Sequence, residues 1–451
     1  MTRAVETLRS DLAALVGESK VTFEPAACSA LAVDGQTPVC VVYPPSAEQV
    51  AAVLRYAADC ELAVLPCRNA TKLHTGNPPR RYDLALSLKE LNQVWHYEPA
   101  DLTISAEPGM KFGDFQHFVA RHGLWLPLDP RGGAKASLGG ILATNSSGTL
   151  RLRYGAPRDM VLGLKIATVE GKIIKTGGRV VKNVAGYDLG KLLVGSYGTL
   201  GVIVEASLKL YPLPAERATW VLRVGTLGRA GELRRRLLHS PLEPFRMTLL
   251  DGRAATLVRA ASRPAGEGKE PEVWVEAGGS VRVIERCERE LEDLGRAADA
   301  PVTRLEAGEA ENVWARISDP LTWLKEAYPD AVVLRAALPI AASEELLTRV
   351  QQEAESEAVG AAGFAQLGVG VVTLCLLQPR RAAEFSGLVR RLRQAGQDLG
   401  GTLVVEHCPW EFKSGIEAWG SAGDDFEAMR KLKEVWDPKG VLSPGRFLGG
   451  L

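Results

Sequence analysis

Hydrophobic positions in the first hundred residues switch between a helical and a strand spacing. Apolar side chains recur every third or fourth residue from 3 to 16, which predicts one amphipathic helix. Short β-branched runs at 39–43 and 63–66 predict strands, and the stretch from Ser46 to Ala57 between them has the helical period. Residues 83–88 alternate, so the pattern predicts a β-α-β unit followed by a further strand.

A second set of elements extends to residue 210. The pattern predicts a helix over 112–122, which Gly123 ends, and a glycine-rich segment at 138–148. Strands are expected over 102–106, 161–168, 172–176 and 202–210. Pro212 and Pro214 then break the pattern, which predicts a domain boundary near residue 215.

Beyond residue 215, strands and helices alternate. Strand-like runs at 218–224, 272–277, 331–337, 370–377 and 402–406 are separated by helical patterns near 282–297, 343–357 and 381–398. This alternation predicts an antiparallel sheet with helices on one side over roughly residues 216–425. A last helix is expected over 426–436, and the predicted fold class is α+β.

The balance of charges limits the classes of function. The 451 residues contain 54 Lys and Arg against 54 Asp and Glu, so no basic surplus supports nucleic-acid binding. The densest basic run, Arg234 to Arg236, lies in a helical pattern and is expected to face solvent. The start lacks the features of a secretory signal and no apolar run of about 18 residues occurs, which predicts a cytoplasmic chain without a membrane span.

The cysteines and glycines narrow the choice of cofactor. None of the seven cysteines belongs to a Cys-x-x-Cys pair, which disfavours an iron–sulfur cluster or a zinc ribbon and suits reduced thiols. No Gly-x-Gly-x-x-Gly follows a strand, so a nicotinamide-binding fold is disfavoured. Residues 66–76 and 137–148 combine small residues with backbone donors, as an extended dinucleotide phosphate requires. On this pattern alone, a dinucleotide site and tight packing of loop against helix remain equal alternatives.

Several short motifs occur in a fixed order: Pro44–Val50, Leu138–Asn145, Tyr154-Gly155, Asp159–Leu164 and Gly195–Ile203. Together they resemble the FAD-binding domain of the vanillyl-alcohol oxidase and p-cresol methylhydroxylase (PCMH) type. Val181–Asp188 is most similar to the E subunit of bacterial glycolate oxidase, and Met429–Phe447 resembles the ending of the same family. The resemblance is dense over 39–214 and about 401–447, and thin between them.

The resemblance implies an arrangement of domains. A two-lobed PCMH-type FAD-binding domain would occupy residues 20–215, with lobes of about 20–105 and 106–215, after an N-terminal helix at 1–19. A cap domain of sheet and helices, of ferredoxin-like type, would follow at 216–425. Residues 426–451 would return to the FAD domain.

Carried over residue by residue, the resemblance implies a site for non-covalent FAD. The pyrophosphate loop corresponds to Arg68, Asn69, Ala70, Thr71 and Lys72. The flavin-side set comprises Ser137, Gly139, Gly140, Ala143, Thr144, Ser147, Gly148 and Tyr154, with Val202 and Ile203 along the ring or the adenine. The family has a glycine run where this chain has Arg68 to Ala70, so each residue forced to a positive φ would cost about 1 kcal/mol or more. His74 is displaced from the positions at which relatives attach flavin covalently.

The substrate site departs further from the family. Catalytic relatives carry a His-x-Gly-Asp-Gly-Asn-x-His-like strand that binds a metal, whereas the corresponding residues here run from Gln366 to Thr373 and cannot complete such a site. Glu406 and His407 match a later Glu-His pair and are the candidate catalytic residues, either as a base near the flavin or as a structural remnant. Arg316 and Arg335 are candidate cations for a substrate carboxylate.

These features lead to three hypotheses for function. The first is an FAD-binding subunit of a glycolate-oxidase-like 2-hydroxy-acid dehydrogenase complex. Such a subunit would need a catalytic flavoprotein and an iron–sulfur partner, and could associate with a membrane through them. The second is a self-sufficient FAD-dependent 2-hydroxy-acid oxidoreductase. The third, favoured by Arg68 to Ala70, is a scaffold subunit that keeps the fold without flavin.

Overall fold

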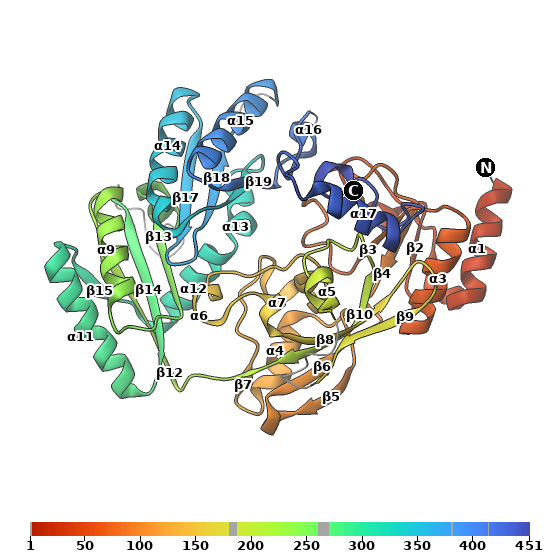
Figure 1. The fold of residues 1–451 in the computed structure, drawn as a ribbon, viewed down its shortest axis with the longest axis horizontal. Coiled ribbons are helices and arrows are strands. Elements are labelled where there is room, and N and C mark those ends of the chain that lie inside the picture. Colours follow the sequence, from red (N-terminus) through yellow and green to blue (C-terminus); the bar gives the residue numbers. More distant parts are fainter. Residues whose placement is uncertain (1, 180–186, 260–269, 380–381, 414) are drawn as a thin grey trace. The chain divides into compact units, whose positions relative to one another are not determined.

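The computed structural model describes residues 2–179, 187–259, 270–379, 382–413 and 415–451 (Figure 1). Contacts divide the chain into two compact units. The first comprises Met1–Ser146, Ala156–Leu213 and Ser421–Leu451, and the second comprises Ser147–Gly155 and Pro214–Gly420. Most of the motif Val181–Asp188 lies outside the described residues. Within those ranges, every helix is too short or too polar to cross a membrane.

The N-terminal part of the first unit is a small sheet with helices packed against it. Its strands follow the order β1-β2-β4-β3, and both β2 and β3 pair with β4 in parallel. Ser46 caps the long helix α3 by accepting a hydrogen bond from the Gln49 N–H at 3.3 Å. Buried Leu12, Leu54 and Leu84 join α1, α3 and the sheet in one core. The elements are α1 (Thr2–Val16), η1 (Glu18–Lys20), β1 (Val21–Thr22), α2 (Pro25–Ser29), β2 (Cys40–Val42), α3 (Ala47–Asp59), β3 (Val64–Cys67) and β4 (Leu84–Ser87).

A second, antiparallel sheet follows in the same unit. Its order is β5-β6-β10-β8-β9, formed by β5 (Val94–Glu98), β6 (Thr103–Ala106), β8 (Val161–Ala167), β9 (Ile173–Gly177) and β10 (Val202–Lys209). The sequence pattern missed β5, because no residue of this edge strand is fully buried and a bulge between Val94 and His96 interrupts its alternation. The second sheet therefore begins before residue 105, where the boundary between the lobes was expected.

Short helices and the C-terminal segment complete the first unit. They are η2 (Pro99–Asp101), α4 (Phe112–Ala120), η3 (Gly133–Lys135), α5 (Leu138–Ala143), α7 (Pro157–Met160), α8 (Leu189–Leu193), α17 (Phe426–Trp436) and η5 (Leu448–Gly450), together with the paired strands β7 (Leu124–Trp125) and β11 (Tyr211–Pro212). After α17 the chain runs beside β3. The Val64 N–H donates to the Val441 carbonyl at 2.8 Å, and the Ser443 N–H donates to the Val64 carbonyl at 2.9 Å.

The second unit is built on one antiparallel sheet of order β15-β12-β14-β13-β17-β18-β16-β19. Its strands are β12 (Glu216–Arg223), β13 (Arg246–Leu250), β14 (Glu272–Gly279), β15 (Val302–Arg304), β16 (Val332–Ala337), β17 (Gly360–Gln366), β18 (Val371–Leu377) and β19 (Thr402–His407). Its helices are α6 (Arg151–Tyr154), α9 (Leu227–His239), α10 (Gly252–Arg259), α11 (Val281–Ala298), α12 (Ala307–Ser318), α13 (Pro320–Ala327), η4 (Ile340–Ala342), α14 (Ser343–Ser356), α15 (Ala382–Asp398) and α16 (Trp410–Lys413).

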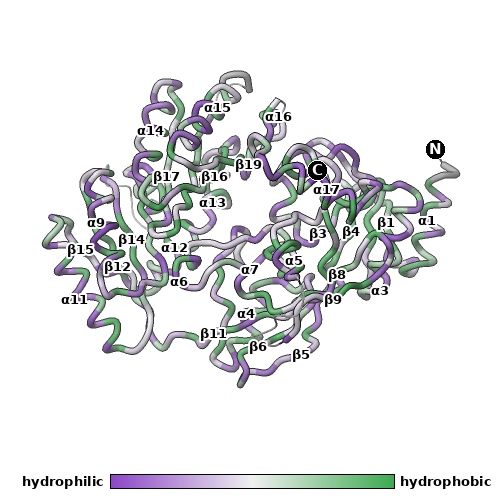
Figure 2. Tube along the Cα trace, in the orientation of Figure 1, coloured by the Kyte–Doolittle hydropathy of each residue, from purple (hydrophilic) through white to green (hydrophobic). Residues whose placement is uncertain are grey.

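Helices cover both faces of this sheet, so the expectation of helices on one side was wrong. One core cluster joins the strands to α9, α11, α14 and α15, through residues such as Leu233, Leu291 and Leu388. Another joins the opposite face to α10, α12 and α13, through Val258, Trp314 and Leu324. Residues of β12, β13, β14, β16, β17 and β18 supply both clusters, which is why these strands are rich in hydrophobic residues (green in Figure 2).

Candidate functional site

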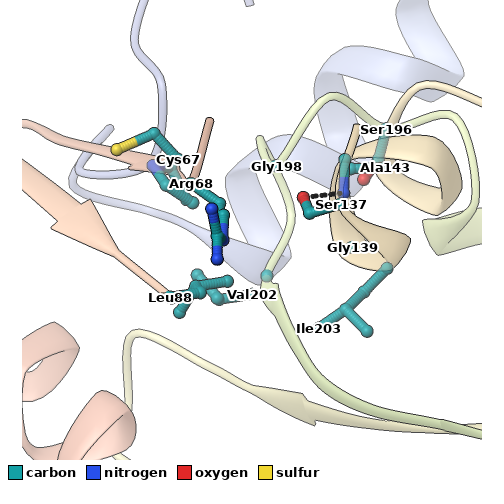
Figure 3. A pocket seen from close by; sticks show the side chains of 13 residues that line it. Cys67, Arg68, Leu88, Ser137, Gly139, Ala143, Ser196, Gly198, Val202 and Ile203 are labelled. Atoms are coloured by element: carbon teal, nitrogen blue, oxygen red, sulfur yellow. Dashed lines mark hydrogen bonds between the residues drawn. The ribbon is translucent and has the colours of Figure 1, made fainter. Parts of the chain in front are cut away.

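A pocket opens in the first unit where three segments meet (Figure 3). The segments are the end of β3, the start of α5 and the loop that leads into β10. Predicted cofactor residues in its lining are Arg68, Ser137, Gly139, Gly140, Ala143, Val202 and Ile203. Pro66 and Cys67 belong to the predicted segment 66–76, but sequence reasoning missed the lining residues Leu88, Ser196, Gly198 and Gly201. The motif Gly195–Ile203 was a usable signal for the last three, although only its final two residues had been assigned.

Close packing explains why small residues line this pocket. A side chain at Gly139 would place its Cβ 2.6 Å from Cβ of Pro108, and one at Gly201 would place its Cβ 2.6 Å from Cγ2 of Ile166. Ser137 begins α5 and accepts a hydrogen bond from the Gly140 N–H at 3.2 Å. Glycine therefore allows the backbone of these two segments to pack closely against Pro108 and Ile166.

The loop after β3 takes a left-handed conformation at Ala70 alone among Arg68, Asn69 and Ala70, with φ 57°. The strain expected from replacing the family's glycine run is thus confined to one alanine, at a cost of about 1 kcal/mol. In the described part of the chain, the N–H groups of Asn69, Ala70 and Thr71 donate no hydrogen bond. Successive free N–H groups around a left-handed residue form a concave anion site.

Arg68 adds a positive charge to the same pocket. Its Nε donates to the Gly109 carbonyl at 3.0 Å and its Nη1 contacts Oδ1 of Asn69. Burial lowers the pKa of the Arg68 guanidinium, and the more distant Asp114 opposes that effect. Among the described residues Arg68 makes no ion pair, and Figure 3 shows it near Leu88 and Val202. A partly desolvated cation beside free N–H groups fits the diphosphate of a dinucleotide.

Other predicted cofactor residues lie next to the lining. Nζ of Lys72 donates to Oγ1 of Thr144 at 3.3 Å, and Nδ2 of Asn69 donates to the Lys135 carbonyl. These bonds hold the loop after β3 to the segment around α5. Thr71 contributes its backbone N–H as described above.

Ser147, Gly148 and Tyr154 belong to the second unit. Nη1 of Arg246 contacts Oγ1 of Thr149 at 3.4 Å, and the rings of Tyr154 and Phe245 lie 5.4 Å apart at their centroids. These contacts hold the segment of Ser147–Gly155 on the sheet of that unit.

The candidate catalytic residues lie on one face of that sheet because of a bulge. Arg335 of β16 is directly opposite Val404, whereas Val333 is opposite His407, so Glu406 is the extra residue. The bulge brings Glu406 and His407 to the face that carries Val333 and Arg335, instead of placing them on opposite faces. Glu406 Oε1 lies 3.8 Å from Nη1 of Arg335, and His407 is buried.

Residues 366–373 comprise the end of β17, a turn at 367–370 and the start of β18, where the resemblance to the family implied one strand. Gly368 and Gly370 take φ of 81° and 75° in this turn. Gln366 pairs with Val371, and Phe364 pairs with Thr373, which lies opposite Arg335. Gln366, Thr373, Arg335 and Glu406 therefore share one face.

The donor set on this face does not fit a divalent metal. Glutamine and threonine are poor ligands, and the cation of Arg335 competes for the carboxylate of Glu406. Among the described residues, no three His, Cys, Asp or Glu side chains cluster as metal ligands. Arg316, the other candidate cation, donates to the Leu257 carbonyl at 2.9 Å and stacks on Trp323. Arg335 is thus the better-placed group for a carboxylate.

A glycine-lined anion pocket and an antiparallel sheet domain define a flavin-dependent oxidoreductase of the PCMH type. Residues 38–177 match the family model described as FAD binding domain, and residues 213–447 match that described as FAD linked oxidases, C-terminal domain. The chain belongs to the FAD-linked oxidase family, and the predicted resemblance to PCMH-type FAD-binding proteins is confirmed.

Relatives with assigned names include dehydrogenases and an oxidase subunit. The chain is 27% identical over 418 residues to glycolate oxidase subunit GlcD of Bacillus subtilis, covering 91% of this chain and 89% of that protein. It is 28% identical over 434 residues to D-2-hydroxyglutarate dehydrogenase of Xanthomonas citri, covering 91% and 89%. It is 28% identical over 430 residues to the mitochondrial D-lactate dehydrogenase [cytochrome] of Arabidopsis thaliana, covering 91% and 73%.

Solved structures show the same fold at low sequence identity. A 4-ethylphenol oxidase from Gulosibacter chungangensis aligns with a TM-score of 0.79 at 16% identity, covering 99% of this chain and 97% of that one. p-Cresol methylhydroxylase aligns with a TM-score of 0.78 at 14% identity, covering 99% and 96%. The predicted α+β, PCMH-type fold class is confirmed.

Proposed function

We propose that the chain is an FAD-binding subunit of a 2-hydroxy-acid dehydrogenase complex and that it holds FAD non-covalently. The observation that supports FAD binding is the pocket lined by Arg68, which is followed in the chain by N–H groups at Asn69 to Thr71 that donate no hydrogen bond in the described part of the structure. Two negative charges of a diphosphate would complement these donors. His74, which lies in the loop after β3, contacts Oδ1 of Asp34 at 3.3 Å and does not line the pocket.

The residues of the second unit support a 2-hydroxy acid as substrate. Arg335 would bind the carboxylate, since its guanidinium is partly exposed and its contact with Glu406 is loose at 3.8 Å. In the self-sufficient alternative, His407 or Glu406 would accept the hydroxyl proton. Bound FAD would supply the acceptor for the two electrons that leave the α-carbon. The named relatives act on acids of this class, as glycolate oxidase subunit GlcD and D-lactate dehydrogenase indicate.

Membership of a complex is supported by the donor set around Arg335. With Gln366 and Thr373 in place of metal ligands, the substrate face lacks the Lewis acid that the family's catalytic strand would hold. We therefore propose that a catalytic flavoprotein subunit and an iron–sulfur subunit accompany this chain in the cytoplasm, and that any contact with a membrane passes through them.

The first test is the absorbance spectrum of the purified chain before and after acid precipitation. We expect flavin bands in the native protein and their full release into the supernatant. The residues that line the pocket include no histidine, and burial raises the pKa of the thiol of Cys67, the lining cysteine, which disfavours the nucleophilic thiolate. Flavin that stays in the pellet would contradict non-covalent binding. A colourless protein that takes up no added FAD would favour the scaffold alternative.

A second test separates the subunit from a self-sufficient enzyme. The flavin-loaded chain alone is expected to be nearly inactive with glycolate and D-lactate and a dye acceptor. If it turns over well, His407→Ala should lower kcat by about 10²–10⁴-fold, as for a general base. The surface variant His239→Ala is the matched control in the same unit. Robust turnover with this loss would replace the subunit proposal by the self-sufficient alternative.

A further inference from the structure

Two buried cations of the C-terminal segment bond to the loops that border the candidate FAD pocket. Lys433 of α17 is 9% exposed and Arg446 is 7% exposed. Charged side chains of this kind are rarely buried unless they are fully paired. Their partners show what each one holds.

Lys433 uses its three N–H donors on three acceptors. Its Nζ donates to the Thr199 carbonyl at 2.8 Å, to the Leu442 carbonyl at 2.8 Å and to Oδ2 of Asp437 at 2.6 Å. Thr199 lies in the loop whose Ser196, Gly198 and Gly201 line the pocket. Lys433 therefore joins the C-terminal helix to the backbone of one wall.

Asp437 extends the same connection to β3. Its carboxylate accepts hydrogen bonds from the N–H groups of Val441 at 2.9 Å and Leu442 at 2.7 Å. The following residue, Ser443, takes φ of 47°, bonds to Val64 of β3 through its N–H and contacts the Gly198 carbonyl through Oγ at 3.4 Å. The wall formed by Gly198 and the strand that ends at Cys67 are thus tied to one segment.

Arg446 holds the loop after β3 through the carbonyl groups of that loop. Its Nη1 donates to the Asn77 carbonyl at 2.7 Å, and its Nη2 donates to the carbonyls of Thr75 at 2.6 Å and of Leu73. Asp34 lies 3.5 Å from Nη1 and supplies the counter-charge. The loop held in this way begins with the free N–H groups of Asn69 to Thr71.

We infer that Lys433 and Arg446 form a clasp that positions the two loops of the FAD pocket and so sets the affinity for FAD without contacting it. The inference rests on the proposed FAD site. Neither cation lines the pocket, so each acts as a positioning residue through backbone carbonyls. Because Arg446 supports the anion-binding loop, its loss should weaken binding of the diphosphate more than binding of the ring.

The experiment measures dissociation constants of FAD and riboflavin for Lys433→Met and Arg446→Met by flavin fluorescence. We expect FAD to bind roughly 10- to 100-fold more weakly to both, as when residues that orient a ligand-binding group are removed. Riboflavin, which has no phosphate, should change less than threefold in Arg446→Met. Lys433→Gln can donate to only two of the three acceptors and should fall between wild type and Lys433→Met. Equal weakening of FAD and riboflavin by Arg446→Met, or unchanged FAD affinity in both variants, would overturn the inference.

Two controls make the comparison specific. Arg430→Met removes a cation from the same helix, where Arg430 pairs only with surface Glu427 and Glu434 among the described residues. Lys439→Met removes a cation from the same C-terminal segment. Lys439 donates to the Ala58 carbonyl at 2.9 Å, and Ala58 belongs to neither of the pocket loops. Both should bind FAD within twofold of wild type.

If the wild-type chain binds no FAD, that result alone refutes the proposed function. Hydrogen exchange of the apoprotein then tests separately whether Lys433 and Arg446 position the two loops. Lys433→Met should then speed exchange around residues 196–201, and Arg446→Met around 69–77, with the other loop unchanged. A uniform rise across the first unit, or no local rise, would reject the clasp. Lys433→Gln provides the same readout if Lys433→Met does not fold.

Discussion

Ala143→Trp is expected to yield a folded protein without flavin. Ala143 ends α5 and lines the pocket together with Gly139 and Gly140 (Figure 3). An indole there would occupy the space between α5 and the loop of Ser196 to Gly201, so FAD and the new side chain would exclude each other. We expect the dissociation constant for FAD to rise at least about 100-fold, which is a loss of about 2.7 kcal/mol.

The measurement is the ratio of flavin absorbance to protein absorbance after purification, followed by titration of the apoprotein with FAD. Ala428→Trp is the control, since Ala428 lies on the exposed side of α17 in the same unit. Circular dichroism of both variants should match that of wild type. Full flavin content in Ala143→Trp would show that FAD does not occupy this pocket, and would remove the main support for the proposed function.

Periodicity predicted many elements of both units, because buried faces demand apolar residues at fixed spacing, but it missed the strands β13, β15 and β17 of the second unit. It also predicted much of the pocket, since close backbone approach requires small residues such as Gly139 and Gly140. Leu88 escaped notice because a buried leucine beside a pocket follows the same pattern as a core leucine. The left-handed conformation of Ala70 could not be predicted either, since residue type alone does not decide which position of the loop takes a positive φ.

Features that depend on partners far along the chain could not be predicted. The bulge at Glu406 exists only in the pairing of β19 with β16, and strict alternation would have put His407 on the other face. Lys433 lies among Lys431, Glu434 and other charged residues of an amphipathic helix, where a solvated lysine is the ordinary expectation. Its burial follows from carbonyls at Thr199 and Leu442, which the local pattern does not reveal.

Glu276→Gln is expected to destabilise the second unit by about 3–5 kcal/mol, the usual result of breaking a buried ion pair. Arg246 binds Glu276 through Nε at 2.6 Å and through Nη2 at 3.1 Å, and Arg217 binds both oxygens at 3.0 and 2.9 Å. Without the carboxylate, the buried guanidinium of Arg246 loses its counter-charge, although it still stacks on Trp314 and contacts Thr149. Urea denaturation followed by tryptophan fluorescence measures the effect, and Trp274 and Trp314 report on this unit.

The pH dependence of that loss distinguishes an ion pair from packing. Burial raises the pKa of Glu276, but the guanidiniums of Arg246 and Arg217 outweigh it and hold the pKa below its ordinary value. The pair therefore stabilises the fold above the unfolded pKa of about 4.3, and this contribution is lost as the pH falls through the folded pKa. The difference in the free energy of unfolding between wild type and Glu276→Gln should be constant from pH 6 to 8 and should narrow below about pH 4.

Glu243→Gln is the control, because it breaks an exposed pair with Arg153 in the same unit and should cost at most about 1 kcal/mol. A gap that stays constant down to pH 3 would mean that shape, and not charge, sets the contribution of Glu276. Arg246 would then hold the segment of Ser147–Gly155 without help from its ion pair.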